Sequence, residues 1–165
     1  MPAKRRILSA SADSKMPGPF QPPRVSQMNR ISLPAPMREE LAAIAVDGYP
    51  YETCGVLVGA CADDGVRVEK VFQARNLNTE RARDRYVLDP DDLMSADLAA
   101  REAGLEIVGF WHTHPDHPAR PSETDREAAW DGYSYIILSV SGSRVEDLRS
   151  WRLNGEGFVE EQVAA

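Results

Sequence analysis

Apolar residues recur along the second half of the chain in short runs that are typical of buried strands. Residues 105–110 (LEIVGF) contain the β-branched Ile107 and Val108, and residues 133–140 (YSYIILSV) form a second run rich in β-favouring side chains. Similar patterns predict further strands at residues 52–61, 66–72, 86–88, 147–153 and 158–163. A turn at residues 63–65 (DDG) should join the first two of these strands as a hairpin.

Two other segments repeat apolar residues at helical spacing, and a third opens with a capping pattern. Helices are therefore predicted at residues 37–46, at 90–103, and from Ser122 to about Asp131. Gly104 lies just past the second helix, where a glycine often ends one. The side chains of that helix expected to face inward are Leu93, Met94, Leu98 and Ala99. Because strands alternate with three helices, the chain is predicted to be one α/β domain with a mixed sheet.

The first thirty residues lack this periodicity. They are basic and carry five prolines, at positions 2, 17, 19, 22 and 23. Residues 1–30 are therefore predicted to be a disordered basic tail, and residues 31–165 the folded domain. Within that domain, the polar stretch at residues 75–84 is predicted to be a long loop.

Composition is that of an ordinary globular protein. The chain has 165 residues, which is enough for one domain with a core. Of these, 42% are hydrophobic and 27% are charged. No apolar run is long enough to cross a membrane, and the two apolar residues after the basic start are too few for an export signal, so we expect a cytoplasmic protein. Cys54 and Cys61 flank one predicted strand on opposite faces and are expected to be unpaired thiols.

Charge is spread unevenly along the chain. The net charge is −7, but residues 1–33 carry +5 and the remainder carries −12. An acidic body argues against nucleic acid as the main substrate. The basic segment spreads its charges over thirty residues, which is typical of a solvated arm.

All three histidines of the chain lie within one six-residue window, 112–117. Successive side chains of a strand point to opposite faces, so His112 and His114 project from one face of the strand that begins near residue 105. Pro115 has no N–H for a ladder and should end that strand. His117 is interpreted as a loop histidine outside any metal shell.

A carboxylate follows at a short distance along the chain. Ser122 and Asp125 begin the third predicted helix, so strand, loop and helix start could aim two imidazoles and one carboxylate at one point. Three such ligands with one open position are typical of a catalytic zinc site. The histidine pair and the Ser-x-x-Asp pattern are each weak evidence for a metal site when taken alone. Paired histidines occur on surfaces, and Ser-x-x-Asp is an ordinary capping pattern. Together they favour a metal.

The order His112-Thr-His114, seven residues, Ser122, two residues, Asp125 resembles the JAMM (MPN+) motif of zinc metallopeptidases, in particular the small stand-alone bacterial type. A stretch opened by Glu52 (ETCGVLVG) is similar to the first strand of that family. The resemblance runs from about residue 31 to the end and implies a cytidine-deaminase-like JAMM/MPN architecture. It implies Zn²⁺ bound by His112, His114 and Asp125. It also implies Glu52 as the catalytic acid/base and Ser122 as a stabiliser of the oxyanion.

The choice of acid/base does not follow from spacing alone. A zinc peptidase needs a proton acceptor outside the metal shell. Glu106 shares the strand and face parity of His112 but lies roughly 20 Å from it along the strand. Glu123 and Glu127, on the third helix, could be solvated or could favour its N-terminus. The residues alone do not decide which glutamate is the acid/base, and the family resemblance selects Glu52.

The resemblance also implies a substrate class. Eukaryotic members remove ubiquitin-like modifiers by cutting isopeptide bonds, and small bacterial members are associated with sulfur carrier proteins. We therefore expect a peptidase or isopeptidase that cuts after the C-terminal Gly-Gly tail of a ubiquitin-like or sulfur carrier protein. Alternatives are a general zinc peptidase on short peptides, a non-catalytic MPN scaffold and a relative associated with DNA repair. The filled ligand positions count against the scaffold. The absent His-x-Glu and Pro-Cys-x-x-Cys signature leaves deamination unsupported.

Overall fold

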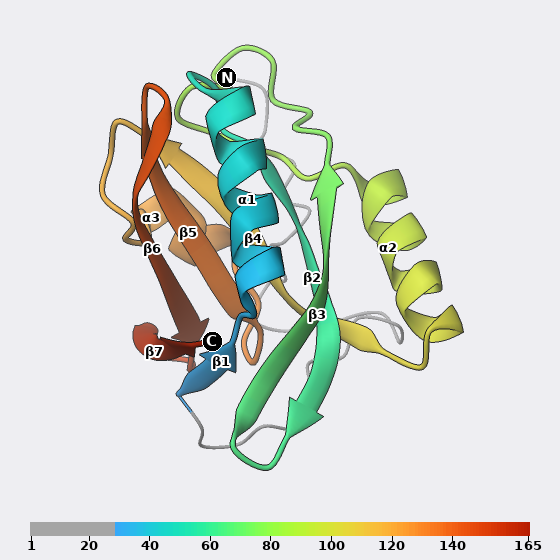
Figure 1. The fold of residues 1–165 in the computed structure, drawn as a ribbon. Coiled ribbons are helices and arrows are strands. Elements are labelled where there is room, and N and C mark those ends of the chain that lie inside the picture. Colours follow the sequence, from blue (N-terminus) through green and yellow to red (C-terminus); the bar gives the residue numbers. More distant parts are fainter. Residues whose placement is uncertain (1–28) are drawn as a thin grey trace.

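In the described part of the chain, seven strands close into one mixed barrel, with helices packed around it (Figure 1). The computed structural model describes residues 29–165, so most of the predicted tail, residues 1–28, lies outside the described residues. Neighbouring strands follow the order β1-β3-β2-β4-β5-β6-β7. The mixed sheet and the three helices confirm the predicted fold class, and the finer cytidine-deaminase-like arrangement stays a prediction. The elements are β1 (Arg30–Ser32), α1 (Ala35–Gly48), β2 (Cys54–Ala62), β3 (Gly65–Ala74), α2 (Pro90–Glu102), β4 (Glu106–Pro115), α3 (Glu123–Ala128), β5 (Ser134–Ser141), β6 (Arg144–Leu153) and β7 (Phe158–Ala164).

The short strand β1 closes the barrel. It pairs in parallel with both β3 and β7, and Ile31 lies opposite Val66 on one side and Val163 on the other. Ile31 is fully buried. Three residues are too few for a strand period to be visible in a sequence, so this closure was not predicted.

The two faces of the sheet carry separate apolar clusters. One cluster joins β2, β4 and β5 to α2, and Phe110 lies in it beside Tyr133 and Tyr135. The other joins the opposite face to α1, and Trp111 is fully buried there. Figure 1 shows α1 and α2 as separate helices flanking the sheet. Both faces of β4 are therefore covered, which explains why the strand is buried almost throughout.

The buried face of α2 differs from the prediction. Leu93 faces inward as expected, but Met94 and Leu98 are 51% and 59% exposed. The buried stripe instead continues through Ala96, Asp97 and Ala100. Asp97 is tolerated there because its carboxylate accepts a hydrogen bond from Nε of Arg101 at 2.9 Å.

A bulge in β4 changes which residues share a face. In the pairing with β2, Leu57 lies opposite Gly109 and Val58 opposite Ile107, so Val108 is the extra residue. Ile107 therefore joins the cluster of Phe110, and alternation puts Glu106 on the other face. The predicted face parity of Glu106 with the histidines was wrong, because a bulge reverses parity.

Gly55 allows β2 and β4 to approach closely beside the histidines. The indole Nε1 of Trp111 donates to the carbonyl of Phe72 at 3.1 Å, passing over Gly55. A Cβ on Gly55 would lie 1.9 Å from that carbonyl oxygen and 2.5 Å from the indole nitrogen. Only a glycine leaves this space free.

Several predicted boundaries move. Residues 86–88 form no strand, and only an isolated bridge joins Leu88 to Asn76. Helix α3 ends at Ala128 rather than near Asp131, and β6 begins at Arg144 rather than at residue 147. Among the described residues, no helix has the length and apolar content needed to span a bilayer. Both cysteines are free thiols, as expected.

Candidate metal centre

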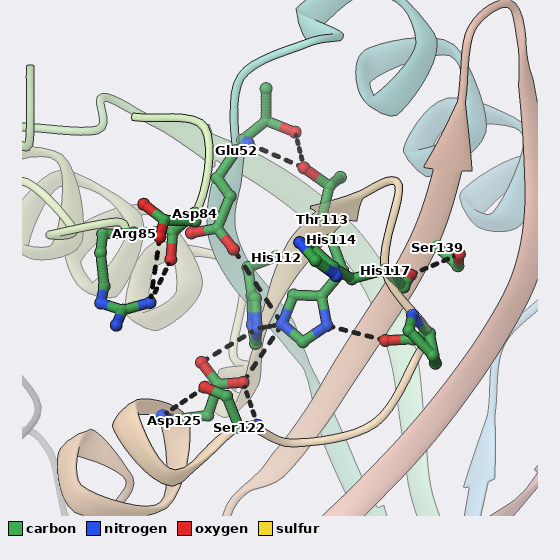
Figure 2. Close-up of polar contacts among 12 residues, drawn as sticks. Glu52, Asp84, Arg85, His112, Thr113, His114, His117, Ser122, Asp125 and Ser139 are labelled. Atoms are coloured by element: carbon green, nitrogen blue, oxygen red, sulfur yellow. Dashed lines mark hydrogen bonds and ion pairs between the residues drawn. The ribbon is translucent and has the colours of Figure 1, made fainter. Parts of the chain in front are cut away.

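His112 and His114 meet at the carboxyl end of β4, as strand alternation predicted (Figure 2). Their side chains are almost fully buried, and their Nε2 atoms lie 3.0 Å apart. Nδ1 of His114 lies 2.8 Å from the carbonyl of Pro118, which orients that ring. The ring of Tyr86 stacks on His112 with centroids 4.7 Å apart. Nothing in the sequence pointed to Tyr86, because it comes from the loop before α2.

Asp125 faces both imidazoles from the first turn of α3. Its two carboxylate oxygens lie 3.3 Å from Nε2 of His112 and 3.2 Å from Nε2 of His114. The three side chains thus offer ligand atoms that all lie within 4.8 Å of one another. Ser122 caps the helix, because its Oγ accepts from the N–H of Asp125 at 3.1 Å.

The electrostatics of the cluster suit a bound cation. Burial lowers the pKa of His112, so its imidazole stays neutral, the form in which histidine binds metals. Burial also acts to lower the pKa of His114, but Asp125 outweighs it and the pKa is raised. Although burial alone would raise the pKa of Asp125, both histidines hold it well below its ordinary value. Two nitrogens and one carboxylate oxygen are the donor set of a catalytic zinc site.

Glu52 lies beside this cluster, although sixty residues of chain separate it from His112. Its side chain is 6% exposed, and its Oε1 lies 4.0 Å from Nε2 of His114 (Figure 2). The strand pairing brings it there, because Cys54 of β2 pairs with His112 of β4. Burial raises the pKa of Glu52 from 4.5 to about 8, since the charged form loses its hydration.

A sequence profile of a known family matches residues 34–154 of this chain. The profile describes prokaryotic homologues of the JAB domain. The chain belongs to this family. The resemblance seen in the histidine, serine and aspartate spacing is thereby confirmed at the level of the family.

Relatives of this JAB-domain protein include named enzymes. A desampylase from Haloferax volcanii is 38% identical over 141 residues, which cover 82% of this chain and 96% of that protein. A CysO-cysteine peptidase from Mycobacterium tuberculosis is 31% identical over 124 residues, covering 74% and 82%. A Desulfitobacterium hafniense protein solved in solution has a TM-score of 0.72 and 32% identity, covering 81% of this chain and 90% of that chain.

His117, Glu106 and Glu123 of the JAB domain lie apart from the cluster. His117 is exposed, and its backbone makes its hydrogen bonds: its N–H donates to the carbonyl of His114, and its carbonyl accepts from Ser139 Oγ. Glu106 is exposed and accepts from the Cys61 thiol. Glu123 is exposed on α3 and pairs with Arg126. These positions leave Glu52 as the glutamate beside the histidines in the described part of the chain.

An open groove begins at Glu52. Its other lining residues come from the segment just before β2, from the end of β3 and the residues after it, and from the first turn of α2. They are Thr53, Gln73, Ala74, Arg75, Asn76 and Asp92. The JAB domain therefore has a buried cluster of metal-type ligands with a glutamate between that cluster and an open groove.

Proposed function

We propose that this protein is a zinc peptidase that hydrolyses the amide bond after the C-terminal tail of a ubiquitin-like or sulfur carrier protein. The observation that carries the proposal is the buried convergence of His112, His114 and Asp125, with Glu52 4.0 Å from His114. The names of two relatives, a desampylase and a CysO-cysteine peptidase, support the substrate class.

Each residue of the cluster has a proposed task. Held by His112, His114 and Asp125, Zn²⁺ would supply Lewis acidity and lower the pKa of a bound water. Glu52 accepts the proton of the attacking water as the new C–O bond forms. It then delivers that proton to the leaving amine as the C–N bond breaks. Burial raises the pKa of Glu52, and the charge of bound Zn²⁺ would lower it again, so that the ionised carboxylate could accept the proton and hold it between these two steps.

Ser122 is proposed to stabilise the oxyanion that forms during attack. Its Oγ accepts from the N–H of Asp125, which leaves the hydroxyl hydrogen available as a donor. Ser122 is exposed, so its hydroxyl is accessible from outside the protein. Donation to a developing negative charge is a large part of catalysis in acyl transfer.

The groove that begins at Glu52 suits an extended peptide tail. A tail lying in this groove could bind as an added strand, held by backbone hydrogen bonds. The bond to be cut must then pass beside the buried Glu52, where space favours residues without large side chains. Gly-Gly meets this need, so we propose cleavage directly after it, with release of an amino acid such as cysteine or of a lysine-linked partner.

The test uses a sulfur carrier protein from the source organism, extended by one cysteine beyond Gly-Gly, and follows its intact mass. Zinc-loaded enzyme should remove the added residue. Chelator should abolish the reaction, and Glu52→Gln should slow it by at least about 10²-fold because the proton acceptor is lost. The matched control is Glu123→Gln, which removes an exposed carboxylate of α3 and should leave turnover unchanged.

Two outcomes would overturn the proposal in different ways. Cleavage of unrelated short peptides, with no cleavage of any Gly-Gly carrier, would indicate a general zinc peptidase. Zinc-loaded protein that cleaves neither class would indicate a non-catalytic scaffold.

A further inference from the structure

The main-chain groups of Glu52 are held by a loop rather than by the sheet. Strand β2 begins only at Cys54. The backbone N–H of Glu52 donates to the carbonyl of Ala82 at 2.6 Å, and its own carbonyl accepts from Nδ2 of Asn76 at 3.2 Å. Both partners belong to residues 75–89, which connect β3 to α2. The position of the buried carboxylate therefore depends on this loop.

Asn76 joins the loop to Glu52 with every hydrogen-bonding group of its side-chain amide. Nδ2 also donates to the carbonyl of Arg85 at 3.1 Å. Oδ1 accepts from the backbone N–H groups of Asn78 and Val87, at 3.0 and 2.9 Å. An amide has two donor hydrogens and two acceptor lone pairs, so all four are engaged. One side chain thus ties the first and last parts of the loop to Glu52.

The loop is also held at its base. The backbone N–H of Arg75 donates to Oδ2 of Asp92 at 2.7 Å, and its carbonyl accepts from the N–H of Asp89 at 3.1 Å. The side chain of Arg75 forms ion pairs with the same two aspartates. Figure 2 shows Asp84, from the middle of the loop, beside Glu52. The loop is thus closed at its base and held together by the hydrogen bonds of Asn76, so it supports Glu52 firmly.

We propose that Asn76 is a positioning residue that sets Glu52 in place at the metal centre, an inference that rests on the proposed function. It acts through the main chain of Glu52 and touches no reacting atom. Loss of the Nδ2 donors frees the Glu52 carbonyl, so the carboxylate leaves its position 4.0 Å from His114. A displacement of about 1 Å at a catalytic group can cost about 10²-fold in rate.

The chain offers a sharp set of variants. Asn76→Asp keeps the shape of the side chain and its acceptors but removes both donors, and Asn76→Ala removes all four bonds. Asn78→Ala is the matched control. The Oδ1 of Asn78 accepts from the N–H of Arg81 at 3.0 Å in the same loop, and among the described residues its side chain has no bond to Glu52.

Turnover of the cysteine-extended carrier should separate positioning from binding and from folding. For Asn76→Asp we expect kcat to fall about 10²-fold, with KM within about threefold of wild type and zinc content unchanged. Asn76→Ala should behave alike, and Asn78→Ala should keep kcat within about threefold. Unchanged kcat in Asn76→Asp, a rise in KM alone, or an equal loss in Asn78→Ala would each overturn the inference.

A measurement on zinc-free protein keeps the inference testable if the substrate is wrong. Hydrogen exchange of the Glu52 amide should accelerate about tenfold or more in Asn76→Asp, because the loop carrying Ala82 loosens, while the amide of Trp111 in β4 is unchanged. Equal exchange at Glu52 in variant and wild type would overturn the inference. Absence of turnover in the wild type, with accelerated exchange in the variant, would instead refute the proposed function and leave the support of Glu52 by Asn76 standing.

Discussion

Oδ2 of Asp125 accepts a hydrogen bond from the backbone N–H of Ser122 at 2.8 Å and lies 3.2 Å from Nε2 of His114. The same oxygen therefore closes the capping box of α3 and faces the imidazoles. Helix α3 has six residues, none of them buried, so core packing contributes little to its placement. The capping box orients the carboxylate instead, and an ordinary helix-start pattern becomes part of the candidate metal centre.

Removal of one imidazole should abolish metal binding. We expect wild-type protein to hold one zinc ion per chain and His114→Ala to hold almost none, because two ligands seldom retain zinc. His117→Ala is the matched control and should keep full zinc content, since His117 lies on the exposed loop. Elemental analysis after dialysis measures both. Equal zinc in wild type and His114→Ala would show that the ligand assignment is wrong.

Removal of the Ser122 hydroxyl should affect rate more than stability. Ser122→Ala should lower kcat about 10²–10³-fold if the hydroxyl donates to the oxyanion. The lost cap should cost only about 1 kcal/mol in the free energy of unfolding. Ser122→Thr keeps a hydroxyl and should recover much of the rate. A variant with normal kcat and a lowered melting temperature would leave Ser122 as a helix cap alone.

The buried Glu52 should make the zinc-free protein less stable at alkaline pH. Its pKa is raised from 4.5 to about 8, so between these values the folded protein keeps a proton that the unfolded chain has released. The free energy of unfolding therefore falls as pH rises from about 4.5 to about 8, and the loss is complete above that range.

Glu52→Gln should remove this loss. In zinc-free protein we expect the melting temperature of Glu52→Gln to exceed that of wild type by about 5 °C or more at pH 9 and by much less at pH 4.5. Zinc should shrink the difference, because its charge favours the ionised carboxylate. Scanning calorimetry at the two pH values measures the effect, and an equal difference at both would contradict the raised pKa.

The packing of Gly55 between β3 and β4 should be sensitive to one methyl group. Gly55→Ala should destabilise the protein by about 3 kcal/mol or more, because the new Cβ would lie 1.9 Å from the Phe72 carbonyl oxygen. Gly157→Ala is the matched control, since a Cβ there has no heavy atom within 4 Å and the change should stay within about 0.5 kcal/mol. Urea denaturation measures both. Equal stability in the two variants would show that the strands can separate at little cost.

Local patterns in the sequence determined a large part of this protein. Strand alternation put His112 and His114 on one face, and the bond from the Asp125 N–H to Ser122 Oγ is the cap that the sequence predicted. The apolar pattern also predicted strand β4, which carries the histidines, and the hairpin formed by β2 and β3. Such features depend on neighbours within a few residues, which is the range over which side-chain periodicity and capping act.

Spacing along the chain left open which glutamate and which loop join the histidines, although the family resemblance pointed to Glu52, and the tertiary structure shows how they come together. Glu52 lies sixty residues before His112, and the pairing of β2 with β4 brings them together. The bulge at Val108, the closure by β1 and the support of Glu52 by Asn76 likewise depend on register between distant segments. Strand register is set by packing across the whole sheet, so a period of two along one segment cannot reveal it.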